Sequence, residues 1–118
     1  MRTIKYRYWN SNEKRMYFQQ SHGWTEFPNT LEKDDVYLEF TGLLDRNGKE
    51  IYEEDIVRLP SEGNWLVGWH ERVAAFGVIS AKEKNAHKIY YFDNMWGLEW
   101  RRNWEVIGNI YENSELLE

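Results

Sequence analysis

The chain has 118 residues, of which 42% are hydrophobic and 17% aromatic, and its formal net charge is −5. This length and apolar content predict a single folded domain over residues 1–118 and exclude an intrinsically disordered chain. The chain has no cysteine, which excludes disulfides, zinc–thiolate sites and cysteine nucleophiles.

The sequence also indicates where the protein works. The N-terminus has no apolar run typical of a signal peptide, and no stretch approaches the roughly 18 apolar residues of a membrane span. We therefore expect a soluble, cytoplasmic protein with no membrane partner. The acidic net charge disfavours general binding to nucleic acids, because such proteins are usually basic.

The first predicted element is a β-hairpin. Ile4, Tyr6 and Tyr8 alternate with the side chains of the opposite face and so line one side of a strand. A polar, turn-forming segment follows, and residues 15–20 form the returning strand. The next segment, residues 21–35, has the irregular composition of a loop.

Further strands are predicted where short apolar or alternating segments are separated by turn signals. They lie at residues 36–42, 55–59, 64–70, 72–80, 87–93 and 104–111. Asn47-Gly48 is the strongest turn signal, because both residues tolerate positive φ. Residues 94–104, with tryptophan at every fourth position, fit a short helix or loop as well as a strand. Residues 113–118 fit a turn or two of helix.

Together these segments predict an all-β, mainly antiparallel fold. It would be a small, partly open barrel or a sandwich of about eight short strands, with at most one or two short helical turns. A parallel α/β fold is disfavoured, because no long helices alternate with the strands.

Five carboxylates surround one glycine turn within residues 41–59: Asp45, Glu50, Glu53, Glu54 and Asp55. A calcium-binding EF-hand loop is excluded, because Lys49 falls at a ligand position and Glu50 falls where the loop needs glycine. The acids alternate with apolar residues, which indicates a turn, a short strand and a second turn at Glu53-Glu54. We expect Asp55 to accept hydrogen bonds from backbone N–H groups of that second turn.

Motifs that carry catalysis are absent from the sequence. The three histidines, His22, His70 and His87, do not lie at metal-ligand spacing. No nucleophile elbow, Walker loop, Rossmann fingerprint or zinc-protease motif occurs. The sequence thus predicts a non-enzymatic protein with no catalytic residue, metal or cofactor. A hydrolase would need a concave pocket that joins a distant histidine to a carboxylate.

The seven tryptophans are the most unusual feature of the composition. Residues 5–9 and 100–104 both interleave aromatic rings with arginine. Such rings can form a core along which arginines lie, a protein interface, or a surface on which bases stack. The candidate interaction surface comprises Arg7, Trp9, Lys14, Arg15, Trp100, Arg101 and Arg102.

Three blocks of the sequence resemble a known family. They are KYRYW at residues 5–9, FTGLLDRNGKEIYEEDIV at residues 40–57, and EVIGNIYEN followed by ELL between residues 105 and 117. In order and spacing they resemble the YopX family. The resemblance implies a mostly β fold, a phage or prophage origin and self-association, and it implies no reaction.

The family motifs also bear on individual positions. Where the family reads Glu-Gly-Asp, this chain has Glu53-Glu54-Asp55, so Glu54 must accept a positive φ or use another turn type. The motif residues are expected to shape turns and strand junctions. They are Thr41, Gly42, Leu43, Asn47, Gly48, Asp55, Ile56, Val57, Gly108 and Asn109.

We therefore expect a non-enzymatic phage accessory protein in the cytoplasm of a bacterial host cell, which self-associates and binds a host or phage protein. The alternative is a nucleic-acid-binding module built on the basic N-terminal hairpin. That alternative predicts one exposed face that carries Arg2, Lys5, Arg7, Trp9, Lys14, Arg15, Arg101 and Arg102.

Overall fold

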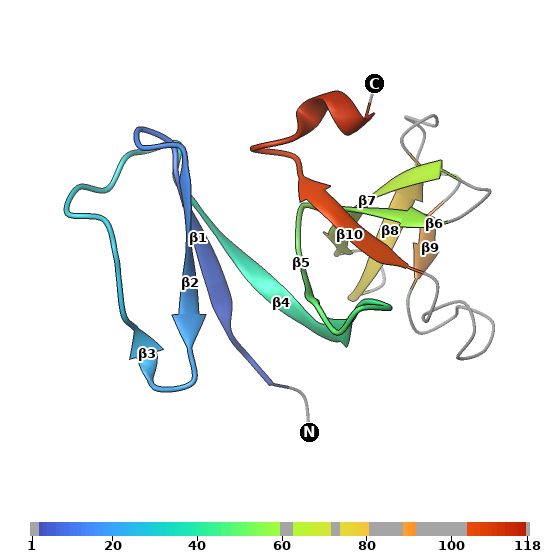
Figure 1. Ribbon diagram of the computed structural model, residues 1–118, viewed down its shortest axis with the longest axis horizontal. Coiled ribbons are helices and arrows are strands. Elements are labelled where there is room, and N and C mark those ends of the chain that lie inside the picture. The colour runs from blue at the N-terminus through green and yellow to red at the C-terminus, as the bar shows by residue number, and fades with distance from the viewer. Residues whose placement is uncertain (1–2, 60–62, 72–73, 81–88, 92–103, 118) are drawn as a thin grey trace.

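The computed structural model describes residues 3–59, 63–71, 74–80, 89–91 and 104–117. These residues form ten strands in two five-stranded antiparallel sheets, which the chain builds one after the other (Figure 1). The all-β, antiparallel prediction is confirmed. The two sheets remain open and do not close into a barrel.

The first sheet has the strand order β3-β2-β1-β4-β5. Its strands are β1 (Tyr6–Asn10), β2 (Arg15–Gln20), β3 (Gly23–Trp24), β4 (Val36–Leu44) and β5 (Glu50–Tyr52). Strand β3 lies in the segment that we expected to be irregular. Two residues are too few to show an alternating pattern, so this strand could not be predicted from the sequence.

The second sheet has the strand order β10-β6-β7-β8-β9. Its strands are β6 (Asp55–Leu59), β7 (Gly63–His70), β8 (Ala75–Ser80), β9 (Ile89–Tyr91) and β10 (Glu105–Asn109). The last strand therefore pairs with β6 at the edge of the sheet, far from its neighbour in sequence. A bulge between Val106 and Gly108 interrupts that pairing.

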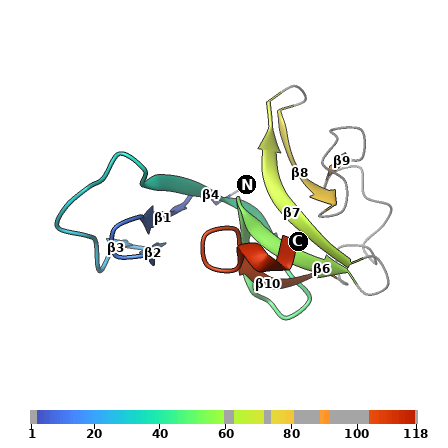
Figure 2. The same cartoon turned by 90° about the horizontal axis from the view of Figure 1, so that it is seen from above.

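The first sheet extends away from the second (Figures 1 and 2). Strands β1, β2 and β3 lie at the far end, and β4 leads from them to the second sheet. Most buried apolar residues form one cluster, which is formed by residues of the second sheet and β5. Its members are Ile51, Val57, Leu59, Trp65, Val67, Phe76, Val78, Trp104 and Val106. Trp104 belongs to the segment of undecided structure, and the rest of that segment lies outside the described residues.

Asp35 fixes the long connection between β3 and β4. Its carboxylate accepts hydrogen bonds from the backbone N–H groups of Ser11 (2.6 Å) and Glu32 (2.9 Å), and from the Tyr8 hydroxyl. Burial raises the pKa of Asp35, but these hydrogen bonds outweigh burial and hold the pKa below its ordinary value. The ionised carboxylate thus ties the first hairpin to the loop that covers it.

The C-terminal residues form a short 3-10 helix, Ser114–Leu117, in agreement with the helical turn predicted for residues 113–118. The N–H of Leu116 donates to the carbonyl of Asn113 at 3.0 Å and closes this turn. Among the described residues, no helix has the length and apolar character that a membrane crossing needs.

Candidate functional site

Arg7 joins the two sheets through a buried ion pair with Asp55. Its Nη2 lies 2.9 Å from Asp55 Oδ1, and the two side chains are 5% and 2% exposed. The same nitrogen donates to the carbonyl of Glu53 at 3.0 Å. The guanidinium also lies over the Tyr52 ring, 4.9 Å from its centroid. Arg7 therefore clamps the β5–β6 turn to β1.

The turn held by Arg7 takes the first of the two forms expected at Glu54, the one with a positive φ. Glu54 adopts a φ of 66°, the left-handed region that glycine enters freely. Its N–H donates to the carbonyl of Val67 at 2.8 Å, and its carbonyl accepts from Ile110 at 3.0 Å. Asp55 Oδ2 accepts the N–H of Tyr52 at 2.7 Å, in the role we expected for this aspartate.

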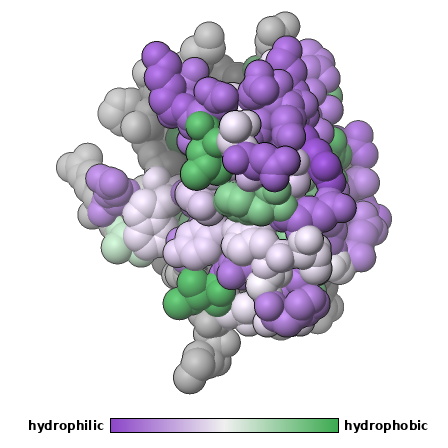
Figure 3. Space-filling model, turned by 90° about the vertical axis from the view of Figure 1, so that its left-hand side faces the viewer, coloured by the Kyte–Doolittle hydropathy of each residue, from purple (hydrophilic) through white to green (hydrophobic). Residues whose placement is uncertain are grey.

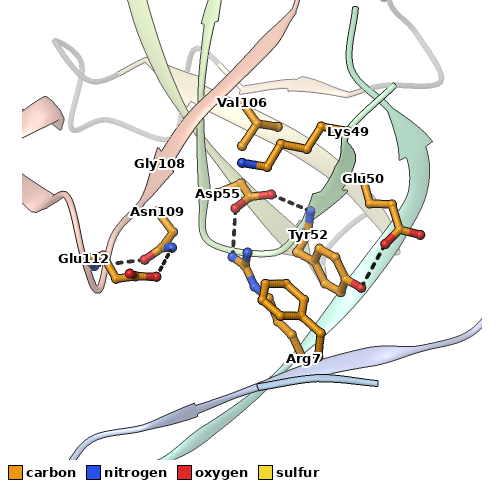
Figure 4. A pocket seen from close by; sticks show the side chains of 10 residues that line it. Arg7, Lys49, Glu50, Tyr52, Asp55, Val106, Gly108, Asn109 and Glu112 are labelled. Carbon is orange, nitrogen blue, oxygen red and sulfur yellow. Dashed lines mark hydrogen bonds and ion pairs between the residues drawn. The ribbon is translucent and has the colours of Figure 1, made fainter. Parts of the chain in front are cut away.

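A cavity of about 330 Å³ lies between the two sheets beside this clamp (Figure 4). Its lining comes from both sheets and from the turn that follows β10. The residues are Arg7, Phe18, Lys49, Glu50, Tyr52, Asp55, Val106, Gly108, Asn109 and Glu112. In Figure 4 the Lys49 side chain reaches toward Asp55 from the side opposite Arg7.

The carboxylates of this cavity are already held by partners. Asp55 is paired with Arg7, and the Lys5 ammonium forms an ion pair with Glu50. Glu112 accepts the Asn109 side-chain amide at 2.9 Å. Burial raises the pKa of Asp55, and the neighbouring guanidinium opposes that shift. The described lining contains no histidine, so it joins no histidine to a carboxylate as a hydrolase would require.

Asp45 is a second buried carboxylate with a structural role. Its Oδ1 accepts the N–H groups of Asn47 and Lys49, each at 2.8 Å, and so shapes the Asn47-Gly48 turn. Its Oδ2 accepts the N–H of Val106 at 2.9 Å. The same side chain therefore holds the β4–β5 hairpin and the start of β10 together.

Gly108 and Asn109 shape the end of β10. A Cβ atom on Gly108 would lie 2.4 Å from Asn113 Oδ1, so the close approach of Asn113 requires glycine here. Asn109 Oδ1 accepts the N–H groups of Tyr111 (3.0 Å) and Glu112 (2.9 Å), which turns the chain after the strand.

The candidate interaction surface does not assemble as one exposed patch in the described residues. Arg7 is buried in its ion pair, and Trp9 is buried in a stack on Tyr111 with centroids 5.4 Å apart. This corrects the expectation of exposure, because both side chains lie on the face of β1 that is covered by Asp55 and by Tyr111. Lys14 and Arg15 are exposed. Trp100, Arg101 and Arg102 lie outside the described residues, as does Arg2.

An aromatic face, which the sequence reasoning missed, covers the outer side of the first sheet. We define it by Tyr8, Tyr17, Trp24, Phe27 and Tyr37. Phe27 contacts Tyr8, Trp24 and Tyr37, with centroids 4.8, 5.0 and 6.5 Å apart. Tyr8 and Tyr17 are buried beneath, whereas Phe27 is 37% exposed and Tyr37 is 58% exposed. Figure 3 shows pale and green atoms gathered on this side, bordered by purple.

Acidic residues border the aromatic face. The loop that carries Phe27 contains Glu26, Glu32, Asp34 and Asp35 against Lys33 alone. An exposed aromatic patch with a charged rim is typical of a surface that contacts another protein. Arg15 also lies on this face, over the Tyr17 ring and in an ion pair with Glu26. The excess of acids in the loop favours a basic partner.

The described residues bring no histidine into the cavity lining and gather no metal-binding cluster. His22 is exposed, the side chain of His70 is not among those described, and His87 lies outside the described residues. Across the described ranges, no three histidine, aspartate or glutamate side chains gather as a metal ion would require.

Comparison with known proteins shows the family and a similar fold. The profile of the family described as YopX protein matches residues 5–118. The crystal structure of protein EF1440 from Enterococcus faecalis is similar, with a TM-score of 0.61 and 22% sequence identity over 100% of both chains. At this identity the likeness shows the fold alone. No curated protein matches the chain.

Proposed function

Because the chain belongs to the YopX family, we propose that it is a phage- or prophage-encoded accessory protein that binds other proteins and catalyses no reaction. Its contact surface is the aromatic face of the first sheet. The observation that carries this proposal is the exposure of Phe27 and Tyr37 on top of two buried tyrosines.

Aromatic side chains on a rigid sheet suit protein binding for a physical reason. They offer a large contact area with few rotatable bonds, so little conformational entropy is lost when a partner covers them. The face is anchored by Asp35, which fixes the Tyr8 hydroxyl beneath Phe27. The proposed partner is a host or phage protein with a basic, partly apolar surface, met in the bacterial cytoplasm.

Self-association is a further part of the proposal. The family resemblance supports it, and sedimentation-velocity centrifugation over a range of concentrations tests it. A sedimentation coefficient that stays at the monomer value at all concentrations would remove this part and leave the protein-binding proposal standing.

The main experiment compares two exposed aromatic residues in different sheets. Immobilised protein is used to capture partners from bacterial lysate with and without the phage, and the captured proteins are identified and quantified. The variant Tyr37→Ser alters the aromatic face, whereas Trp69→Ser alters β7 in the second sheet. We expect Trp69→Ser to retain one stoichiometric protein that Tyr37→Ser loses. Equal capture by both variants would refute the aromatic face as the contact surface.

The nucleic-acid alternative is tested in parallel by titrating the chain with oligonucleotides and following tryptophan fluorescence. Arg7 is engaged with Asp55 and Trp9 is covered, so Lys14 and Arg15 are the exposed bases of the described hairpin. Quenching that weakens steeply with salt would support phosphate contacts and stacking. No quenching at low salt would exclude this alternative.

A further inference from the structure

Strand β2 has an open edge. Strand β1 pairs with β2 over Arg15, Met16, Tyr17 and Phe18. On the other side, β3 pairs with Gln19 and Gln20 and stops there. Outside the strand ladders, the described residues make no backbone hydrogen bond to residues 15–18. Among the described residues, no strand pairs with this four-residue edge, and Thr25 and Glu26 lie beside it.

The spacing of the ladder shows which backbone groups point to the open edge. Gln20 lies opposite Gly23 across a two-residue turn, so its N–H and C=O groups face β3. In an antiparallel ladder, alternate residues direct these groups to the same side. The N–H and C=O groups of Met16 and Phe18 thus point away from β1. In agreement, the Phe18 carbonyl accepts a long 3.5 Å bond from the Gln20 side chain.

A groove runs beside this edge. It has a volume of about 160 Å³. Its lining residues are Arg15, Met16, Tyr17, Phe18, Gln20, Thr25 and Glu26. Phe18 is 45% exposed on the inner side of the sheet. An added strand would place its side chains alternately beside Met16 and Phe18 on one face, and beside Tyr17 and Glu26 on the other.

The groove is covered by a contact that opens easily. Arg15 and Glu26 form an ion pair across it, and their side chains are 55% and 65% exposed. Exposed pairs of this kind contribute little to stability, so a partner can separate them at small cost. Natural sheets usually block such edges with prolines, bulges or covering loops. This edge carries no proline, and no bulge interrupts the β1–β2 register.

We propose that the open edge of β2 binds an extended segment of another protein, which pairs as an additional strand of the first sheet. The segment carries apolar side chains on the face that meets Met16 and Phe18, and basic side chains on the face that meets Glu26. This inference rests on the proposed protein-binding function and names its binding mode, strand addition.

Charge distinguishes this partner from a second copy of the chain. Pairing two β2 edges would bring together two chains that each carry a net charge of −5. A basic segment is instead attracted by that net charge, and it can replace Arg15 as the partner of Glu26 in the groove. The edge is therefore better matched to a foreign basic strand than to itself.

The test uses two synthetic peptides of equal composition. One alternates lysine with valine and phenylalanine, and the other groups the same residues in blocks, so that net charge is constant and the alternation is lost. Isotope-labelled protein is titrated with each, and amide hydrogen exchange is measured. We expect the alternating peptide to slow exchange at Met16 and Phe18, with little change at Tyr17, which already faces β1. The block peptide should protect neither.

A matched pair of variants tests the backbone contact. Met16→Pro removes an N–H that points to the open edge and leaves the β1 ladder intact, because proline is tolerated at such positions. Met16→Val keeps the N–H. We expect Met16→Pro to weaken binding of the alternating peptide at least about fivefold, the effect of one net hydrogen bond, and Met16→Val to retain it.

Four outcomes would overturn the inference. One is equal protection by both peptides, which would indicate charge attraction alone. Another is no protection at Met16 and Phe18 in the unmodified protein, a result that does not depend on how well any variant folds. The third is self-association that Met16→Pro abolishes, which would assign the edge to a second copy. The fourth is that Tyr37→Ser loses the captured partner while Met16→Pro retains it fully; the proposed function then stands and strand addition is refuted.

Discussion

The Arg7 guanidinium lies 2.9 Å from the Asp55 carboxylate and connects the first strand of one sheet to the first strand of the other. The sequence places these two residues in separate motif blocks. In the folded chain they form one buried contact, which also holds the carbonyl of Glu53. Two of the sequence blocks that resemble the family are thus connected by one buried ion pair.

The Arg7–Asp55 ion pair predicts a large loss of stability when one of its partners is removed. Arg7→Met leaves the Asp55 carboxylate buried without its cation, and we expect a loss of about 3–5 kcal/mol in the free energy of unfolding. Urea denaturation measures it. Arg58→Met is the control, because Arg58 is exposed and lies 3.2 Å from Glu105, and it should cost at most about 1 kcal/mol. Similar losses for both variants would contradict a special role for Arg7.

Asp35 predicts a dependence of stability on pH. Its pKa in the folded chain is held below the ordinary value of 3.8. Its contribution is therefore complete above the unfolded pKa and is lost as pH falls toward the folded pKa. We expect Asp35→Asn to be less stable than the unmodified protein at about pH 6, with the difference shrinking toward about pH 2.

Denaturant unfolding at several pH values checks this prediction for Asp35. The adjacent Asp34→Asn is the matched control, because Asp34 is exposed. It should show the same pH profile as the unmodified protein. A gap between Asp35→Asn and the unmodified protein that stays constant down to low pH would show that ionisation of Asp35 does not contribute to stability.

Replacing Gly108 with a larger residue is predicted to destabilise the protein through a steric clash. In Gly108→Ala the new Cβ would meet the Asn113 side chain at 2.4 Å, and we expect a loss of about 1–3 kcal/mol in thermal or urea unfolding. Gly68→Ala has no heavy atom within 4 Å of its new Cβ and should change stability by less than about 0.5 kcal/mol. Combining Gly108→Ala with Asn113→Ala should cost less than the sum of the two, and strict additivity would refute the contact.

Replacing Glu54 with glycine is predicted to raise the stability of the protein. The family motif places glycine at this position, and the φ of 66° strains any residue with a Cβ. Glu54→Gly should raise the free energy of unfolding by about 0.5–1 kcal/mol. Glu54→Ala removes the same carboxylate and keeps the strain, so it serves as the control. An equal gain in both variants would assign the effect to removal of the half-buried Glu54 carboxylate and not to the backbone.

Much of the fold could be predicted because strands have a simple period. The bounds of β2 and β6 agree with the prediction residue for residue. Asn47-Gly48 forms the expected turn, in which Gly48 has a φ of 81°. The division into two sheets was beyond the sequence, because alternation specifies which side of a strand is apolar and says nothing of which strands become neighbours.

The candidate site was predicted less well, and Arg7 shows why. An arginine among aromatic residues suits an exposed binding surface and a buried clamp equally well in composition. The difference depends on Asp55, whose distance from Arg7 no spacing rule gives. The aromatic face was missed because Phe27 lies in a loop without period, although Tyr8 was placed on a strand face. Trp9 looked exposed because its stacking partner, Tyr111, is supplied by the other end of the chain.

The two hydrogen-bonding directions of Asp45 bear on the order in which the chain folds. One oxygen shapes an early hairpin, and the other accepts the N–H of Val106 in the last strand. During synthesis the hairpin can form at once, but the edge of β6 stays uncovered until residues 105–109 emerge from the ribosome. Long-range closure of this kind is slow compared with hairpin formation. The final strand is thus the step at which a nascent chain is most exposed to mispairing, and Asp45 provides the contact point that receives it.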